Sequence, residues 1–586
     1  RQILSSSASC VKDENMRNSE KNGENINLLR EVTEVRRKWL LSCVYVVVIV
    51  ALLVSGCSRG GNNEPGNGNQ STGPGSSSNN EMNDQQKDTA DRIQFPLQEP
   101  VKLEIFANTA PQVKKDYNEL QMFKELKELT NVDVEWTQVS WEHLGEKKNI
   151  LLASGDLPDV FYGRAVLSDA EIVKLGSQGA IIPLEGLIEQ YAPNLQKVFE
   201  QRPEFKKMLT APDGHIYSLP TIVERDFNEI APVLFINKKW LDNLGLSVPT
   251  TIDEFYTTLK AFKEDDPNGN GQQDEIPLSF QFNNAANGAN SLAGSFGIKL
   301  DDPRNNLYVD NGEVRYAPEQ PEYKAYLQYM SKLFKEGLID PEVFTHDENT
   351  YVTKVRNADV PVGAFFGYSQ RSVFGNVNED YVPVMPLKGA NGEQGWLRMP
   401  VALNKGAFAI TSVNKYPEIT MQWMDTMYDE LLSFQFEIGP IGVTVKENED
   451  GTFDKQEIPE GMNSGDFKHS EAPGNGATVI VLKEMVERLI DEQADEKRAY
   501  YNMYLPYTTD ELIYDMLWST EDAEKLAEIN LDLNGKNGYY ASTYAKFVMN
   551  GFTDEDWNNH LEQLKKLRVD EYKALYQKYY DSYVGK

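Results

Sequence analysis

The chain has 586 residues, of which 40% are hydrophobic and 11% aromatic, so it can bury a substantial core and is long enough for more than one domain. This composition excludes disorder throughout. Acidic residues outnumber basic ones by 90 to 58, and the formal charge of -32 would repel a nucleic-acid backbone. We therefore expect no nucleic-acid partner, and we expect a monomer.

The reactive residue types are sparse. The three cysteines, Cys10, Cys43 and Cys57, all lie near the start of the chain, so the globular part can form no disulfide. The five histidines are scattered without the paired spacing of zinc sites or of HExxH catalysis. The sequence also has no Gly-x-Ser-x-Gly elbow, no phosphate-binding glycine loop and no carboxylate pair that stands out. We expect that the protein is not an enzyme.

The N-terminal region has the layout of a secretory signal. Three basic residues at 36–38 precede an uncharged stretch at 39–54, which is too short for a confident membrane span. The stretch ends in Val-Ser-Gly followed by Cys57, and this resembles the lipobox of bacterial lipoproteins, in which the signal is cleaved before a cysteine that becomes diacylated. We predict a signal peptide at 36–56 and a lipid (palmitate) on Cys57. The alternative is a short membrane anchor that is retained.

The flanking segments are not expected to join the fold. Residues 1–35 are polar and aperiodic, and we interpret them as a non-native or upstream extension. Residues 57–92 are rich in Gly, Asn and Ser and nearly free of apolar residues, so they cannot repay the entropy of folding. They form a flexible tether in this interpretation. Because two acyl chains give stable anchoring, the folded part would lie at the outer face of the cell membrane.

The folded part begins with alternating strand and helix patterns. Residues 101–107, 132–139 and 159–162 are typical of strands, while 112–130 and 143–153 have the apolar spacing of helices. This alternation predicts βαβ units and a mainly parallel sheet.

A second α/β layer follows. A strand at 233–237 runs directly into a helix at 238–244, and a helix at 252–263 begins with a capping box of Thr251 and Glu254.

The last third of the chain, from Pro417, is mostly helical, with the strongest periodicity at 479–489 and 560–580. The predicted fold class is α/β, with two lobes and a helical C-terminal part. Periodicity alone assigns no function to this arrangement.

Five segments occur in the order found in a known family. They are 151–160 (LLASGDLPDV), 214–220 (GHIYSLP), 235–242 (FINKKWLD), 249–255 (PTTIDEF) and 266–271 (DPNGNG). Together they resemble the family 1 extracellular solute-binding proteins, especially the large lipoproteins of Gram-positive bacteria and the alginate-binding periplasmic proteins. The resemblance covers about residues 101–586.

This resemblance implies a periplasmic-binding-protein-like fold with a ligand cleft between two lobes. By outline, the first lobe would comprise 93–230 and 361–411, and the second 231–360 and 412–586. The first crossover would lie near 220–224. Such a protein would bind an oligosaccharide and deliver it to the permease subunits of an ABC importer.

The loop at 266–275 carries oxygen-bearing side chains at alternating positions, as in the first half of an EF-hand calcium loop. We predict a structural Ca²⁺ site with the ligands Asp266, Asn268, Asn270, Gln272, Asp274 and Glu275, where Gln272 would use its backbone carbonyl. EF-hand spacing would place a glutamate at position 277, which is proline, and the resemblance to alginate-binding proteins suggests Glu275 instead. The alternative is a turn made by Asn-Gly pairs, which needs no metal.

Sugars are bound by aromatic rings and planar hydrogen-bonding side chains, so the cleft candidates are residues of these types in predicted loops. They are Glu224, Arg225, Asp226, Phe366, Tyr368, Arg371, Trp396 and Arg398. Arg371 and Arg398 would suit a ligand carboxylate and hence an acidic sugar, but the sequence does not decide between neutral and acidic. Trp136, Trp240 and Trp423 are interpreted as core, whereas Trp141 and Trp518 are ambiguous.

The predicted function is an extracellular carbohydrate-binding lipoprotein. Two alternatives from other classes stay open at this point: a receptor for a peptide or regulatory ligand, and a polysaccharide-active enzyme.

Overall fold

The computed structural model describes residues 93–586 except 283, 286, 358–361, 402 and 536–537. These residues belong to one compact unit of the chain. The predicted signal peptide, Cys57 and the tether lie outside the described residues. Within the described part, no helix has the length and apolar character needed to span a bilayer.

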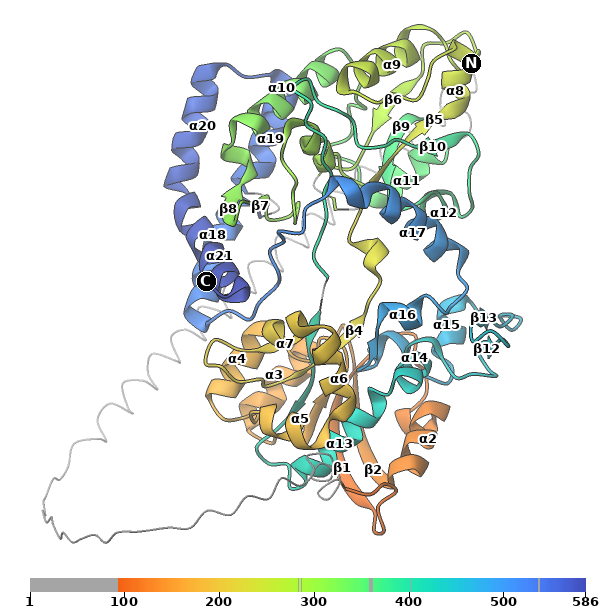
Figure 1. The fold of residues 1–586 in the computed structure, drawn as a ribbon, viewed down its shortest axis with the longest axis vertical. Helices are drawn as coiled ribbons and strands as arrows, with labels where there is room; N and C mark the ends of the chain where they lie inside the picture. Colours follow the sequence, from red (N-terminus) through yellow and green to blue (C-terminus); the bar gives the residue numbers. More distant parts are fainter. Residues whose placement is uncertain (1–92, 283, 286, 358–361, 402, 536–537) are drawn as a thin grey trace, which may run out of the picture. The chain divides into compact units, whose positions relative to one another are not determined.

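The first lobe is built on a six-stranded sheet with the order β14-β4-β11-β3-β1-β2 (Figure 1). Its strands are β1 (Val101–Thr109), β2 (Val132–Ser140), β3 (Val160–Tyr162), β4 (Leu219–Val223), β11 (Asn404–Ile410) and β14 (Ile480–Val481). β1 pairs in parallel with β2 and β3, as the βαβ pattern predicts. β11 is antiparallel to both β3 and β4, so the sheet is mixed.

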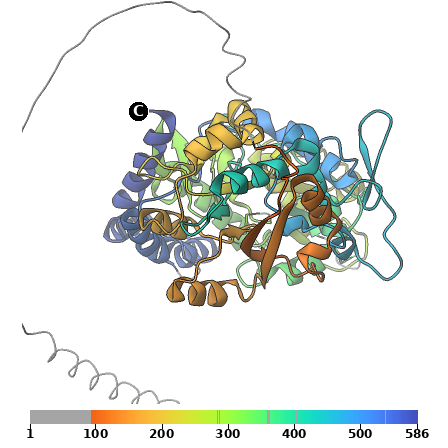
Figure 2. The same cartoon turned by 90° about the horizontal axis from the view of Figure 1, so that it is seen from below.

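Helices cover both faces of this sheet (Figure 2). Ile105 and Phe106, neighbours on β1, lie in separate core clusters, because successive side chains of a strand point to opposite faces. One face packs against α2 (Gln121–Thr130), α5 (Glu185–Tyr191), α6 (Pro193–Gln201), α7 (Pro203–Leu209), α13 (Pro417–Met427) and α14 (Glu430–Ile438). The other packs against α3 (Leu144–Ser154) and α4 (Asp169–Ser177).

The second lobe has a four-stranded sheet with the order β10-β5-β9-β6. The strands are β5 (Val233–Asn237), β6 (Ile276–Ser279), β9 (Val362–Gly367) and β10 (Tyr381–Pro383). β5 leads directly into α8 (Lys238–Leu244), as predicted, because the Asn237 side chain accepts a hydrogen bond of 3.0 Å from the Trp240 N–H and caps the helix. The lobe also contains α9 (Ile252–Glu264), α11 (Glu348–Val355) and α12 (Gln370–Phe374).

The helical C-terminal part belongs largely to the second lobe. Its helices are α17 (Glu492–Tyr504), α18 (Thr520–Leu533), α19 (Tyr539–Asn550), α20 (Asp554–Lys566) and α21 (Val569–Val584). α19 packs on α10 (Pro321–Lys335) through two tyrosine pairs, Tyr323 with Tyr540 and Tyr326 with Tyr544, each with hydroxyl oxygens 2.9 Å apart. The hairpin of β7 (Leu307–Asp310) and β8 (Glu313–Tyr316) packs against α21.

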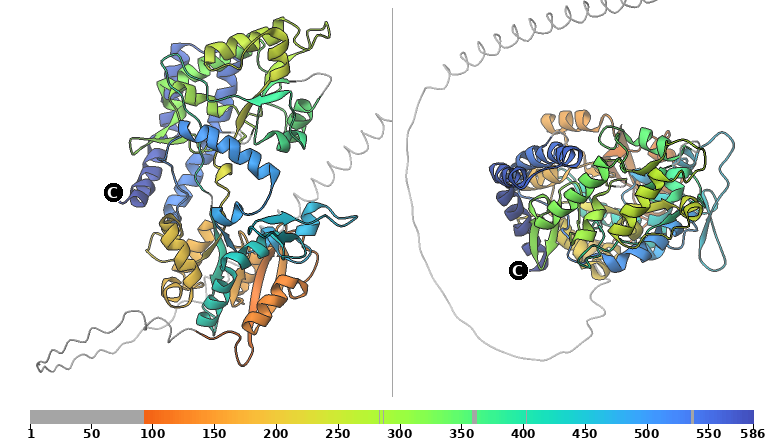
Figure 3. Two further views of the ribbon diagram at one scale, coloured as in Figure 1. Left: turned by 45° about the vertical axis from the view of Figure 1, so that its right-hand side comes forward. Right: turned by 90° about the horizontal axis from the view of Figure 1, so that it is seen from above.

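Among the described residues, three crossovers connect the lobes, at about 224–232, 384–401 and 487–491 (Figures 1 and 3). In the chain segment that precedes the third crossover, the first lobe also contains the hairpin of β12 (Val445–Glu447) and β13 (Phe453–Lys455), followed by α15 (Ser464–Lys468) and α16 (Lys483–Val486). The segment between α17 and α18 returns to the first lobe, where Met516 and Leu517 are buried in its core clusters.

The division of the chain between the lobes differs from the prediction. Residues 361–411 were assigned to the first lobe, but β9 and β10 pair within the second sheet. Residues 412–586 were assigned to the second lobe, yet β14 extends the first sheet beside β4. The reason is physical: β9 is buried at every position, and a continuous apolar strand does not indicate which sheet it joins.

Three helix predictions were too long. Of residues 112–130, only α2 from Gln121 onward is α-helical. The predicted helix at 479–489 is strand β14 followed by the short α16. The one at 560–580 is two helices, separated where Arg568 adopts a positive φ of 65°. The Thr251 hydroxyl caps α9 by accepting a hydrogen bond from the Glu254 N–H, but the Glu254 carboxylate accepts from the Thr250 N–H and not from that of Thr251, so the capping box is incomplete.

Candidate functional site

A hollow of about 770 Å³, here called the interlobe cleft, lies between the two lobes beside the crossovers. The first lobe lines it with Arg164, Thr221, Val223 and Asn404. The crossovers line it with Glu224, Arg225, Asn228, Glu229, Met399, Pro400 and Val401. The second lobe and the segment before α18 contribute Asp301, Asp302, Arg304, Asn305, Leu307, Tyr368, Ile513, Tyr514, Asp515, Trp518, Asn530, Asn534 and Tyr576.

Most of the charge in the cleft is neutralised by the protein itself. Four of its five carboxylates form ion pairs with N–O distances of 2.7 to 2.9 Å. The pairs are Glu224 with Arg202, Glu229 with Arg398, Asp302 with Arg304 and Asp515 with Lys405. Burial raises the pKa of Glu229 even though Arg398 acts against that shift. The fifth carboxylate, Asp301, pairs with no cation of the described residues.

The arginines leave little positive charge for a ligand. Arg225 lies 3.4 Å from Glu437, a buried carboxylate that also binds Lys468 at 2.9 Å. Burial alone would raise the pKa of Glu437, but Lys468 and Arg225 together hold it below its usual range. Arg164, two residues after the end of β3, is exposed.

Aromatic rings line the cleft, from the second lobe and from the segment before α18. Trp518 is half-buried, and its ring meets that of Tyr576 edge-on with centroids 5.1 Å apart. Tyr368 is also half-buried, with the Lys497 ammonium group 4.7 Å from its ring centroid. Polar side chains beside half-buried rings are the combination by which proteins bind polar ligands with apolar faces.

Three of the eight predicted cleft residues line the cleft: Glu224, Arg225 and Tyr368. Three others lie near the crossovers without lining it, and each is held in an ion pair. Asp226 pairs with Lys483 at 2.8 Å, Arg371 with Glu492 at 2.7 Å, and Arg398 with Glu229 at 2.9 Å.

The predictions for Phe366 and Trp396 were wrong, because both side chains are core. Phe366 lies on β9 and is fully buried. Trp396 is 1% exposed, donates its ring N–H to the Pro232 carbonyl at 2.9 Å and packs edge-on against Tyr504. An aromatic residue in a loop is therefore not evidence of a cleft position, since crossovers also need large side chains to fill the core beneath them.

Sequence reasoning missed most of the second-lobe wall. Asp301, Asn305, Asn530, Asn534 and Tyr576 come from a loop and from helices that are distant in sequence. Trp518 was left ambiguous, and its position directly before Ser519, the cap of α18, was the available signal.

The loop at 266–275 is ordered by its own polar groups. The Asp266 carboxylate accepts hydrogen bonds from the Asn270 and Gly271 N–H groups at 3.1 and 2.9 Å. The Asn270 side-chain oxygen accepts one from the Gln272 N–H at 2.7 Å. Gly269 and Gly271 both have φ above 70°, which the tight turn requires.

The fit of this loop to a cation rests on Glu275. Its Oε1 atom is buried without a hydrogen-bond partner, and burial, with Asp274 and Asp266 close by, raises the pKa of the carboxyl group. No three His, Cys, Asp or Glu side chains converge as a metal site anywhere in the described part of the chain, so a cation here would also need amide and backbone oxygens.

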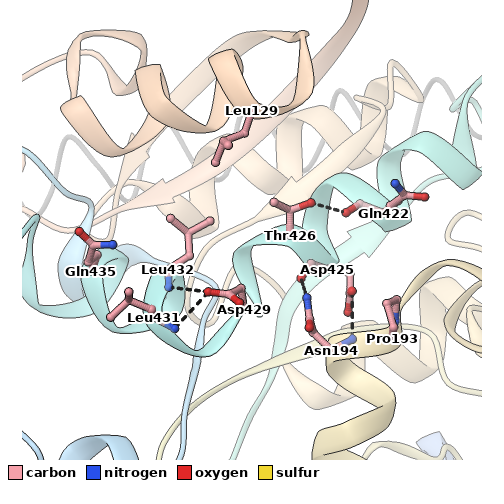
Figure 4. Close-up of a pocket in the computed structure, with 10 residues that line it drawn as sticks. All are labelled: Leu129, Pro193, Asn194, Gln422, Asp425, Thr426, Asp429, Leu431, Leu432 and Gln435. Atoms are coloured by element: carbon pink, nitrogen blue, oxygen red, sulfur yellow. Dashed lines mark hydrogen bonds between the residues drawn. The ribbon is translucent and has the colours of Figure 1, made fainter. Parts of the chain in front are cut away.

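Two other hollows differ from the cleft. One of about 350 Å³ adjoins it at Val223, Arg225 and Asn228 and is lined mainly by side chains of the first lobe and α17. Another, of about 450 Å³, lies on the first lobe alone (Figure 4). Its polar groups serve helix caps: Asp429 accepts hydrogen bonds of 3.1 Å from the Leu431 and Leu432 N–H groups.

Two α/β lobes joined by crossovers around a polar, ring-lined cleft form an arrangement that is suited to the capture of a solute. A family model described as "Bacterial extracellular solute-binding protein" matches residues 110–430. The chain therefore belongs to the bacterial extracellular solute-binding proteins.

Among its relatives is the fructooligosaccharide ABC transporter substrate-binding protein FusA of Streptococcus pneumoniae. FusA is 34% identical over 515 residues, which cover 84% of this chain and 92% of FusA. The solved structure of FusA in complex with kestose has a TM-score of 0.67 at 31% identity and covers 83% of this chain and 99% of that one. A FusA EF-hand mutant, solved in complex with fructo-nystose, gives the same values.

Two further solved structures share the fold. An HMO-binding solute-binding protein of Bifidobacterium longum infantis has a TM-score of 0.71 at 26% identity, covering 83% of this chain and 99% of that one. The alginate-binding protein AlgQ2 has a TM-score of 0.55 at 23% identity with the same coverage, which supports the fold alone. The resemblance to this family and the predicted fold class are confirmed.

Trp396→Ala is expected to destabilise the protein by about 3–5 kcal/mol, because truncating a fully buried tryptophan removes its packing and leaves a cavity. Chemical denaturation of the parent and the variant measures the difference. A loss below about 1 kcal/mol would show that Trp396 is not core.

Proposed function

We propose that the protein is an extracellular lipoprotein that binds a neutral oligosaccharide in the interlobe cleft and delivers it to the permease subunits of an ABC importer. FusA, which aligns along most of this chain, is a fructooligosaccharide-binding protein of such a transporter. The proposed activity is binding, and no catalytic step is assigned to the cleft.

The observation that favours a neutral ligand is the charge balance of the cleft. Its lining contains five carboxylates and three arginines, and two of these arginines, Arg225 and Arg304, already contact carboxylates. Arg371 and Arg398, the candidates for an acidic sugar, are held by Glu492 and by Glu229 with Asp510. Apart from the exposed Arg164, which has no ion pair among the described residues, the cleft offers an anionic ligand only arginines that are already paired, beside an excess of carboxylates.

Ligand capture in this proposal closes the cleft. A sugar that touches both lobes shifts the open and closed populations only by its difference in affinity for the two states. The closed arrangement would then present both lobes to the permease together.

The proposal is tested by calorimetry and melting curves with kestose as the neutral probe and an alginate oligosaccharide as the acidic one. Kestose is expected to bind and raise the melting temperature, and the alginate oligosaccharide is not. Scattering should show a smaller radius of gyration with kestose. Binding of the acidic sugar alone, or of neither it nor any neutral oligosaccharide of a wider panel, contradicts the proposal.

A matched tryptophan pair locates the site in the same assay. Trp518→Ala is expected to weaken kestose binding about tenfold or more, on the order of 1.4 kcal/mol, through loss of a ring in the cleft. Trp141, which is 42% exposed on the first lobe, supplies the control, and Trp141→Ala should bind as the parent does. Equal affinities for the two variants would place the ligand elsewhere.

A calcium ion at 266–275 is part of the proposal, with a structural role. Asp266, Asn268, Asn270, Gln272, Asp274 and Glu275 would hold it through oxygen atoms, and its charge would compensate the carboxyl group of Glu275, whose Oε1 atom is buried without a partner. The solved structure of the FusA EF-hand mutant contains fructo-nystose, which fits a loop that supports the fold and does not contact the sugar.

Chelation by EDTA is expected to lower the melting temperature, with added Ca²⁺ restoring it, because the ion binds the folded loop and not the unfolded chain. Asp266→Ala should abolish the response. Asp310→Ala, which removes a surface carboxylate on β7, should retain it. If neither EDTA nor Ca²⁺ changes the melting temperature of the parent, the loop does not bind a calcium ion.

Lipid attachment at Cys57 completes the proposal and would keep the protein at the outer face of the membrane. In a bacterial host, Cys57→Ala is expected to abolish lipid labelling and to release the protein or leave it unprocessed. Cys43→Ala, in the uncharged stretch, is the matched control and should be labelled normally. Labelling that survives in Cys57→Ala would refute the assignment.

A further inference from the structure

Asp301 is the exception among the carboxylates of the interlobe cleft. It lies in the loop before β7 and is 1% exposed. Its Oδ2 atom accepts a hydrogen bond of 3.0 Å from the Ile513 N–H, which belongs to the segment between α17 and α18. Its Oδ1 atom is buried without a partner in the described part of the chain.

The surroundings of Asp301 do not compensate this carboxyl group. Its charged neighbours, Asp302 and Glu511, are both acidic, and together with burial they raise its pKa well above the usual range. A buried carboxyl group with an unused atom costs stability, and such groups are kept where a partner arrives in the functional state.

The other polar groups of the same wall are already engaged with one another. The Asn534 amide oxygen accepts hydrogen bonds from Asn306 at 3.0 Å and from the Tyr316 hydroxyl at 2.8 Å, while its NH₂ group donates to Asn530 at 3.0 Å. This network fixes the wall, and the one atom of it that stays unpaired among the described residues, Asn306 Oδ1, belongs to a residue that does not line the cleft. Asp301 Oδ1 is therefore the unpaired buried atom of a cleft residue on this side, in a lining that also contains the Trp518 ring.

We propose that Asp301 is a specificity-determining residue that exchanges a hydrogen bond with a hydroxyl group of a neutral sugar at the second-lobe wall of the cleft. The inference rests on the proposed function and identifies Asp301 as a side chain that would recognise a hydroxyl group of the sugar. A hydroxyl both donates and accepts, so it satisfies Oδ1 in either protonation state of the carboxyl group. A ligand carboxylate would instead meet Asp301, Asp302 and Glu511, three acidic side chains.

The test compares three variants of the full chain, with kestose as the first probe and otherwise the neutral oligosaccharide of the panel that stabilises the parent most. Asp301→Ala is expected to lose at least tenfold in affinity by calorimetry. Asp301→Asn is expected to stay within threefold of the parent, because its carbonyl oxygen can accept from Ile513 while its NH₂ group serves the ligand. Ser291→Ala removes another buried, unpaired polar atom, one that lies outside the cleft, and should bind as the parent does.

Melting curves without ligand separate recognition from folding. Asp301→Asn, which keeps an acceptor for the Ile513 N–H, should melt close to the parent, whereas Asp301→Ala loses that hydrogen bond and is expected to melt somewhat lower. If Asp301→Ala does not fold, Asp301→Ser, whose hydroxyl is shorter, is judged by the same tenfold criterion. A loss below tenfold in the alanine variant, or an asparagine variant as weak as the alanine one, overturns the assignment while the proposed function stands. A parent that binds no neutral oligosaccharide overturns both.

Discussion

Charge buried where the lobes meet must be neutralised inside the protein, and this requirement shapes the cleft. Arg202 binds Glu224 in a bidentate pair at 2.8 and 3.0 Å, and Arg398 binds Glu229, so the first crossover is held at both ends. Removing one partner of such a buried pair typically costs several kcal/mol, because the other charge is left uncompensated. This part of the cleft is consequently a fixed surface, and four of the five carboxylates that line the cleft are already paired.

Because of this constraint, the paired side chains fix the shape of the cleft, and the side chains that remain unpaired are the ones available to a ligand. The sequence suggested Arg371 and Arg398 as ligands for a sugar, but in the structure both side chains form ion pairs, with Glu492 and Glu229 respectively. The groups left available are the half-buried rings, the exposed Arg164, and the unpaired buried oxygen atoms of Asp301 and Asn228. The proposed selectivity for a neutral sugar would follow from the polar groups that the protein leaves without an internal partner.

The sequence predicted those parts of the fold that depend on local chemistry. β5 and α8 have the predicted bounds because an apolar strand ends at an asparagine that caps the next helix. The allocation of β9 and β14 to their sheets was wrong or missed, since pairing partners more than a hundred residues away leave no local pattern. The same limit explains the cleft: Glu224 and Arg225 follow a crossover and were found, whereas Trp396 was misplaced and Asp301 was not considered. The calcium loop and Cys57 were proposed from short motifs and stay predictions.

The return of the chain to the first lobe before α18 has a mechanical consequence. Leu517 is 1% exposed in a first-lobe core, and Lys405 on β11, 2% exposed, holds the Asp515 carboxylate at 2.7 Å. Withdrawing a buried leucine costs about 1.5–3 kcal/mol, and separating Lys405 from Asp515 would leave a buried ammonium group with fewer partners. We therefore expect this segment to travel with the first lobe when the cleft opens. The hinge of the motion would then include residues 515–518 as well as the three crossovers. The lobes would separate on the side of the cleft that lies away from these four connections, and the additional connection would restrict the directions in which they can open.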